Sequence, residues 1–214
     1  VVARLADVRR HAEDQPERSR RPFLDLHPFL GESREPSLQR HYWSQTMSHT
    51  TLAVIRKEHA AFAALLRSLQ MLLEEHRKQG SLPDFSVLRA MLFYVDEFPE
   101  KRHHRKESEL LFPKLRERTT LARDLLDRLD EEHLQGEWLI RDLEHSLLAF
   151  EMMGEARREA FETEVARYAD FYLAHMRAEE QKILPLAEQA LTQEDWAELD
   201  EAFAANRDPL TGDE

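Results

Sequence analysis

His103-His104-Arg105-Lys106-Glu107-Ser108-Glu109-Leu110-Leu111-Phe112-Pro113 is the stretch that decides the fold, because its pattern occurs twice. The second copy is His175-Met176-Arg177-Ala178-Glu179-Glu180-Gln181-Lys182-Ile183-Leu184-Pro185. Each copy has His, three residues, Glu, four residues, a large apolar residue and Pro. Residues four apart lie on one face of a helix, one turn apart. Two helices that each carry such a pair could therefore close around metal ions.

An earlier dipeptide extends this repeat to both halves of the chain. Glu58-His59 precedes His103 by 44 residues, and Glu132-His133 precedes His175 by 42 residues. Each half is therefore predicted to be a helical hairpin, with one His on its first helix and the His/Glu pair on its second. We interpret the two halves as one domain built of two related hairpins.

The hydrophobic pattern predicts four long helices. Apolar residues recur at steps of three and four from Thr50 to near Gly80, and from Asp84 through the first copy with Pro99 inside the pattern. The same spacing returns from Leu121 to Gly154 and from Glu155 to Pro185.

The predicted fold class is thus all-α, an antiparallel up-down four-helix bundle with an N-terminal arm and a short C-terminal helix. The predicted organisation is an arm over 1–49, the bundle over 50–190, and a short helix and tail over 191–214. Thr192-Gln193-Glu194-Asp195 resembles the capped start of that last helix.

Composition excludes several classes of function. The chain of 214 residues has a net charge of -12 and shows no basic stripe, which argues against nucleic acid or an anionic membrane surface as a partner. It has no cysteine, so disulfides, zinc–thiolate sites and iron–sulfur clusters are excluded. No apolar run reaches the roughly 20 residues of a membrane span, and we expect a cytoplasmic protein. Any metal must be held by His, carboxylate and water, ligands that suit iron, manganese or zinc.

Six side chains are the candidate metal ligands: His59, His103, Glu107, His133, His175 and Glu179. In a bundle they would point inward together, and two carboxylates could bridge two cations while two imidazoles cap each ion. A single His on an apolar face is more often a core residue with a hydrogen-bond partner. Four at matched positions, with two matched Glu, favour a dinuclear metal site.

Several assignments stay open at this point. His104, three before Glu107, and Glu137, one turn after His133, are two further candidate ligands. Glu58 and Glu132 are expected in solvent, with hydrogen bonding to ligands as the alternative. Gly136 either leaves space for a small ligand or permits close helix packing. The aromatic residues that either line a pocket around the metals or simply pack the core are Phe62, Phe98, Trp138, Tyr168 and Tyr172.

From about Thr50 to Ala190 the chain resembles the hemerythrin-like family, specifically bacterial hemerythrin HHE cation-binding domains. The matching motifs are Glu58-His59, His103-His104-x-x-Glu107, Glu132-His133 and His175-x-x-x-Glu179. The resemblance implies a non-haem di-iron centre, two iron ions with the four His as terminal ligands and the two Glu as bridges. Oxygen-carrying hemerythrins have His where this chain has Glu137, and a His-x-x-x-x-Asp pattern in place of His175-x-x-x-Glu179. Simple oxygen carriage is therefore not the expectation.

Three functions follow from the resemblance. The first is binding or sensing of a small diatomic ligand, dioxygen or nitric oxide. The second is a redox enzyme that acts on nitric oxide or peroxide, or in the repair of iron centres. The third is a structural metal-binding bundle. Whether the chain is an enzyme is left open. The arm carries an apolar cluster over 23–30 and Tyr42-Trp43, which either covers the bundle or forms a homodimer contact.

Overall fold

The computed structural model describes residues 49–205 and 208–211. Within those ranges every regular element is a helix, and the all-α prediction is confirmed. The elements are α1 (Thr50–Gln79), α2 (Phe85–Val95), η1 (Asp96–His103), α3 (His104–Lys106), η2 (Glu107–Leu111), α4 (Phe112–Arg118), α5 (Arg123–Met153), α6 (Glu155–Ala178), η3 (Glu179–Ile183), α7 (Leu184–Ala190) and α8 (Gln193–Ala204). The predicted arm and its homodimer contact lie outside the described residues, apart from His49.

Glycine and side-chain caps set the ends of the long helices. Gly80 ends α1 in the left-handed conformation at φ 63°, and Asp84 caps α2 by accepting from the Ser86 amide. Thr192 and Asp195 form the predicted capping box at the start of α8. Thr50 and Thr51 do not cap α1, which begins after His49, because the Thr51 hydroxyl instead donates to Asp200.

The second and fourth long helices contain π turns at the repeated motif. The Phe112 amide donates to the Glu107 carbonyl, and the Leu184 amide donates to the Glu179 carbonyl, each five residues back. A proline follows each of these donors, and a proline ring clashes with the carbonyl four residues earlier in a regular α-helix. The wider π turn accommodates that conflict, and such turns are frequent at functional sites. Pro99, which lies inside the predicted second helix, is part of the π-helix η1, and the chain stays helical through it.

The hydrophobic core is divided into two clusters. Along α1, Leu52 and Ile55 belong to one cluster, while Phe62 and Leu66 belong to the other, with His59 between them. The same order occurs on α5, where His133 separates Leu129 from Ile140. The motif residues thus form a polar layer between two apolar regions.

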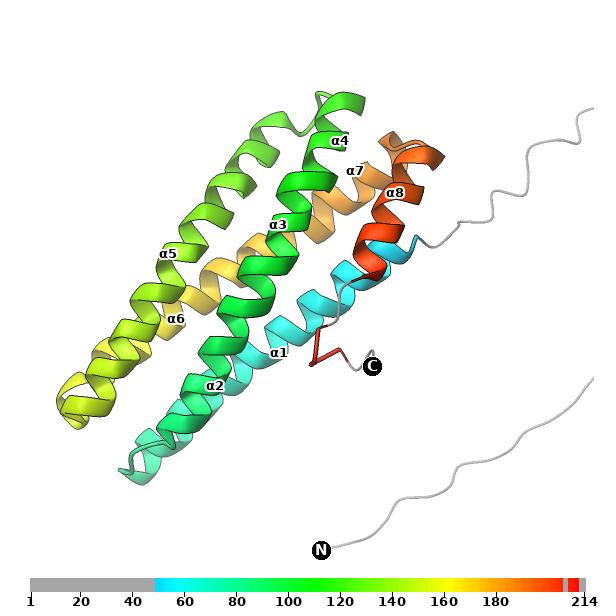
Figure 1. The fold of residues 1–214 in the computed structure, drawn as a ribbon. Coiled ribbons are helices and arrows are strands. Elements are labelled where there is room, and N and C mark those ends of the chain that lie inside the picture. Colours follow the sequence, from blue (N-terminus) through cyan, green and yellow to red (C-terminus); the bar gives the residue numbers. More distant parts are fainter. Residues whose placement is uncertain (1–48, 206–207, 212–214) are drawn as a thin grey trace, which may run out of the picture. The chain divides into compact units, whose positions relative to one another are not determined.

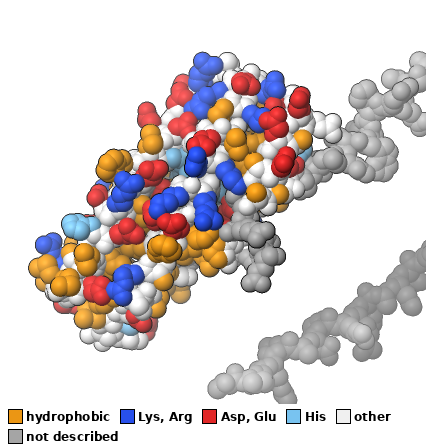
Figure 2. Space-filling view, in the orientation of Figure 1, with side chains coloured by type: hydrophobic (Ala, Val, Ile, Leu, Met, Phe, Trp, Pro, Cys, Tyr) orange, Lys and Arg blue, Asp and Glu red, His pale blue; other side chains and the backbone are white. Residues whose placement is uncertain are grey.

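The long helices pack side by side, as Figure 1 shows. α5 packs along α6, α1 packs on both α6 and α8, and α2 packs on α5. Figure 2 shows acidic and basic side chains interspersed over the visible face, with hydrophobic side chains gathered toward the end where α5 joins α6. None of the helices in the described ranges is long and apolar enough to cross a membrane.

Candidate metal centre

The structure brings the six predicted side chains together inside the helices. His59 comes from α1, His103 from η1, His133 from α5 and His175 from α6, and each imidazole is at most 6% exposed. Glu107 and Glu179, at the first positions of η2 and η3, are 0% and 1% exposed. Each half of the repeat therefore contributes two imidazoles and one carboxylate to one buried cluster.

The imidazoles form two pairs through the same ring atom. The Nε2 atoms of His59 and His103 are 3.0 Å apart, and those of His133 and His175 are also 3.0 Å apart. Each pair joins the two helices of one half of the repeat. Two nitrogen donors at this separation suit two neighbouring positions around one cation.

The two glutamates lie between these pairs. Glu179 has one oxygen 3.3 Å from His59 Nε2 and the other 3.3 Å from His175 Nε2. Glu107 Oε2 lies 3.4 Å from His103 Nε2 and 3.7 Å from His133 Nε2. Within the described part of the chain, none of the four carboxylate oxygens makes a hydrogen bond. A buried carboxylate without a partner is costly, and cations between the imidazole pairs would satisfy both groups.

The outer nitrogen of each imidazole has its own partner. His103 Nδ1 lies 2.6 Å from a Glu58 oxygen and His175 Nδ1 lies 2.8 Å from a Glu132 oxygen, so the expectation that these glutamates lie in solvent was wrong. His59 Nδ1 lies 3.1 Å from Glu180. Each carboxylate accepts the Nδ1 proton and so holds the ring orientation.

Ser108 fills the fourth outer position. Its hydroxyl donates to Asp130 at 2.6 Å, so its oxygen is free to accept the Nδ1 proton of His133 at 2.8 Å. All four rings therefore carry a proton on Nδ1, which leaves the Nε2 lone pairs directed at the cluster. This is the tautomer that a metal ligand needs, and it is set by residues outside the cluster.

The electrostatics match a cation site. Burial disfavours the charged form of His175, but Glu179 and Glu132 outweigh it and raise its pKa to about 10. Burial likewise opposes ionisation of Glu179, and the surrounding imidazoles lower its pKa well below the usual value. The cluster thus holds ionised carboxylates that attract positive charge, supplied by protons when no metal is bound.

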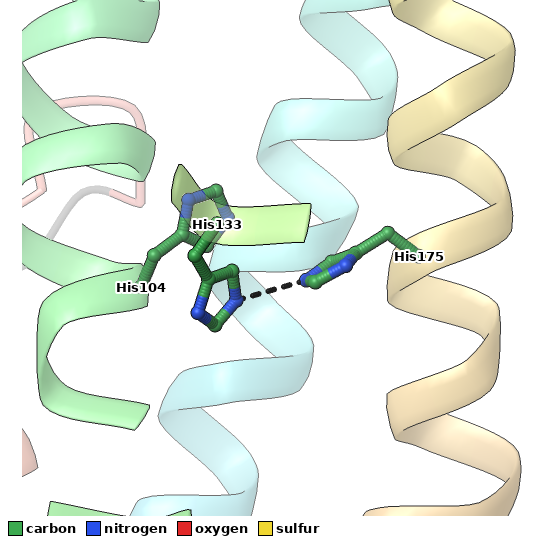
Figure 3. Close-up of side chains that lie close together, drawn as sticks. All are labelled: His104, His133 and His175. Atoms are coloured by element: carbon green, nitrogen blue, oxygen red, sulfur yellow. Dashed lines mark hydrogen bonds between the residues drawn. The ribbon is translucent and has the colours of Figure 1, made fainter. Parts of the chain in front are cut away.

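His104 and Glu137 differ in their burial. His104 is 3% exposed, and its ring stacks on His133 with centroids 4.4 Å apart. Figure 3 shows His104, His133 and His175 close together, and their ligand atoms all lie within 4.8 Å of one another. Glu137 is 49% exposed, lies 3.8 Å from Arg141, and lines an open groove beside the cluster together with His104 and His133. His104 therefore lies within the buried cluster and Glu137 at its exposed border, and both remain predicted additional ligands.

Gly136 makes room for a side chain. A Cβ atom there would lie 1.6 Å from the Tyr172 hydroxyl and 2.9 Å from Glu100 Oε2. Tyr172 stacks on His104, and Glu100 approaches His104 Nδ1 at 3.2 Å. The glycine thus permits close packing, with the Tyr172 hydroxyl in the space, rather than an open ligand pocket.

The sequence interpretation missed some neighbours of the cluster and misplaced one. Trp138 is 66% exposed and lines nothing around the cluster. Glu100 was missed, although it lies one turn before His104, the same spacing that identified the ligands. Ser108 and Glu180 each follow a motif glutamate, and that shared position in the repeat is the signal that could have found them.

The comparison with protein-family models decides the family. The model described as the hemerythrin HHE cation-binding domain matches residues 49–187.

The chain belongs to the hemerythrin HHE cation-binding family.

A comparison with curated proteins gives no match. The hemerythrin-type domain is a metal-binding helical domain, and this chain has the donor groups for that role. Among residues 49–205 and 208–211, the sets of groups that could hold an ion are His59/His103/Glu107, Glu107/His133/Glu179 and His104/His133/His175. Glu107 belongs to two of these sets, which is the arrangement expected of a bridging carboxylate.

Proposed function

We propose that this hemerythrin-type protein holds a non-haem di-iron centre and binds or senses a small diatomic ligand, dioxygen or nitric oxide. The proposal includes an antiparallel up-down arrangement of four helices, which the chain reversals near Gly80 and Gly154 support. The observation that carries it is the pair of buried, unpartnered carboxylates, Glu107 and Glu179, between two imidazole pairs whose Nε2 atoms face inward.

The proposed ligand set is asymmetric. His59 and His103 would hold one iron, His133 and His175 would hold the other, and both glutamates would bridge. His104 would add a nitrogen on the His133 side, since these three rings come together there. Imidazole and carboxylate donors suit iron. When bound, a pair of iron ions supplies redox chemistry and an open coordination position.

The surroundings favour binding of a small neutral molecule. Apolar side chains lie on both sides of the cluster, including Phe62 and Phe112, which are 2% and 0% exposed. The buried ligand side chains leave room for a small molecule and limit side reactions with water, while His104 and His133 also line an open groove. The protein residues would orient the ligands through Nδ1 and keep water out.

One observation favours the redox enzyme as a second candidate. Burial raises the pKa of Glu100 to about 7 despite the hydrogen bond from Tyr168, whose hydroxyl donates to it at 2.6 Å. Glu100 also contacts His104. A carboxyl group that holds a proton near neutral pH could supply it to a reaction that consumes protons, such as peroxide reduction.

The ligand assignment is tested by metal content. Glu179→Gln and His133→Ala should each lower the iron bound per chain to half or less, because each removes a donor that the proposed centre needs. His145→Ala is the matched control, since His145 is exposed on the same helix as His133. Iron should be measured on protein of equal helical content. Equal loading in all three variants would refute the assignment.

Mixing the reduced, iron-loaded protein with dioxygen, nitric oxide and peroxide separates the functions. A stable and reversible spectral change with a diatomic ligand supports binding or sensing. Multiple turnovers with peroxide or nitric oxide would instead support the enzyme, and Glu100→Gln should then slow turnover. No spectral change with any of them would leave a structural metal site.

A further inference from the structure

A small cavity borders the imidazole pair of His59 and His103. Its volume is about 20 Å³, room for one water-sized molecule. Phe62 and Phe98 form part of its wall, and Asp208 closes it from the C-terminal segment. Asp208 follows α8 and lies beyond residue 187, where the match to the family model ends. The family resemblance therefore gives no role to this side chain.

Two hydrogen bonds hold Asp208 in the cavity wall. The Tyr94 hydroxyl donates to its Oδ2 at 2.6 Å, and the Leu210 amide donates to its Oδ1 at 2.8 Å. Asp208 is 7% exposed and Tyr94 is 8% exposed. Because both carboxylate oxygens have fixed donors, the charge stays at one place beside the cavity. A carboxylate buried to this extent is costly unless it is bonded in this way.

The charges that line the cavity are mostly negative. Glu58 and Asp208 contribute carboxylates, and Glu58 is already engaged by His103 Nδ1. With iron bound, His59 and His103 would be neutral ligands, so Arg102 would be the cationic side chain among the lining residues. Its guanidinium carbon lies 4.7 Å from the centre of the Phe98 ring. A small anion entering here would lose hydration and meet a fixed carboxylate, whereas an uncharged diatomic molecule would meet neither penalty.

We propose that Asp208 is a specificity-determining residue, which disfavours small anions on the His59–His103 side of the centre and admits uncharged diatomic ligands. The proposal rests on the proposed di-iron function, because it concerns access to that centre. Asp208 acts by its charge and position, with the Tyr94 hydroxyl as its anchor.

The test compares an anion with an uncharged ligand on the full-length, iron-loaded protein. Azide and nitric oxide are titrated separately, and the affinities are read from the visible spectrum. Asp208→Asn keeps the size and one of the two acceptor oxygens but removes the charge, and it should tighten azide binding about three- to tenfold. Nitric oxide affinity should change less than about twofold, because a neutral ligand gains little from removal of a charge.

Two further variants complete the design. Glu201→Gln removes one exposed charge from α8 and should leave both affinities unchanged. Tyr94→Phe keeps the Asp208 charge but frees it from its anchor, so azide affinity should rise by less than in Asp208→Asn. Iron content, measured on every variant, should stay equal to that of the unmodified protein.

The outcomes separate this proposal from the proposed function. Equal azide affinity with and without the Asp208 charge, or a parallel change for azide and nitric oxide, would overturn the role of Asp208. Azide binding that appears only in Asp208→Asn would support it. Failure of the unmodified protein to bind any diatomic ligand would count against the proposed function alone, since the azide comparison would still decide the charge effect.

Discussion

Gly136 shows how a single residue shapes the surroundings of the cluster. Gly136→Ala would force the new methyl group into the Tyr172 hydroxyl, 1.6 Å away. Overpacking a close-packed site costs about 1–3 kcal/mol, more than the ~1 kcal/mol that alanine gains over glycine inside a helix. We therefore expect a lower free energy of unfolding, measured by denaturant titration of the metal-free protein.

The double variant Gly136→Ala with Tyr172→Phe is the control for that explanation. It removes the Tyr172 hydroxyl, the nearest of the atoms that the new Cβ would meet, and keeps the ring carbon at 2.7 Å and Glu100 Oε2 at 2.9 Å, which side-chain shifts must accommodate. Stability should recover by at least half of the loss. If Gly136→Ala were as stable as the unmodified chain, or if the double variant recovered nothing, the close contact would not be the reason for glycine.

At the residue scale, spacing predicted the side chains inside the cluster far better than the residues that surround it. His59, His103, His133 and His175 could be placed because helical period and repetition act together. Glu137, one turn after His133, lies at the exposed border of the cluster, and its role as a ligand stays a prediction. Asp208 could not be found, because nothing local to a C-terminal turn indicates which distant tyrosine it will meet.

At the scale of the element, the π turns set how the helix segments on either side of them are oriented. Each places a motif glutamate at the first position of a widened turn, with proline two residues after the turn ends. One extra residue in a turn rotates the following helix by about 100° relative to the preceding part. The ligands His175, before η3, and Glu179, at its start, are buried, and so are Ile183, at the end of η3, and Leu184, just after it. The extra residue therefore allows the polar ligands and the apolar residues that follow them to face the interior of the same bundle.

Pro185→Ala tests that explanation. Without the proline ring, η3 can relax toward a regular α-helix, so Glu179 and the downstream apolar residues would compete for the interior. We expect iron affinity to fall about tenfold or more while helical content by circular dichroism stays unchanged, a loss in the range seen for residues that support metal ligands.

Lys182→Ala is the matched control, because Lys182 is exposed in the same π turn. It should keep the iron affinity of the unmodified protein. Unchanged affinity in Pro185→Ala would mean that core packing alone sets the turn. Propensity rules treat proline as a kink or a stop, so the sequence pattern could not predict a continuous π turn before Pro185.

At the scale of the whole molecule, the repeat predicted an all-helical chain with its polar residues in the interior. The structure adds that this polar layer separates two apolar clusters. That division could have been inferred, since each candidate ligand has apolar neighbours both before and after it on its helix. The packing of α8 and the Asp208 turn depends on long-range contacts that a periodic pattern does not encode.

The protonation of the cluster predicts how stability depends on pH without metal. The pKa of His175 is raised from its ordinary 6.5 to about 10, so its stabilising contribution is complete below about 6.5 and is lost as the pH rises through 10. The lowered pKa of Glu179 acts oppositely: its contribution is present above the ordinary 4.5 and is lost as the pH falls. Thermal unfolding of metal-free protein should therefore show its Tm falling between pH 6.5 and 10.

Iron loading should reverse that trend. A metal competes with protons for Nε2, so metal binding releases protons and strengthens as the pH rises. The stabilisation on adding iron, measured as the rise in Tm, should be larger at pH 8 than at pH 6. A metal-free Tm that is flat across the alkaline range, or an iron effect that shrinks with pH, would contradict these charge assignments.

The division of the interior by a polar layer has a mechanical consequence. The motif side chains come from α1, α5, α6 and the run from η1 to η2. Cations bound by these side chains would therefore cross-link all of these helical segments at one level. Without cations, the two apolar clusters would be joined across this polar layer only by imidazoles, carboxylates and the protons that they share. The helices would then be most rigid at the polar layer when metal is bound and least rigid there when it is absent. The local rigidity of the bundle would therefore report whether the centre holds metal.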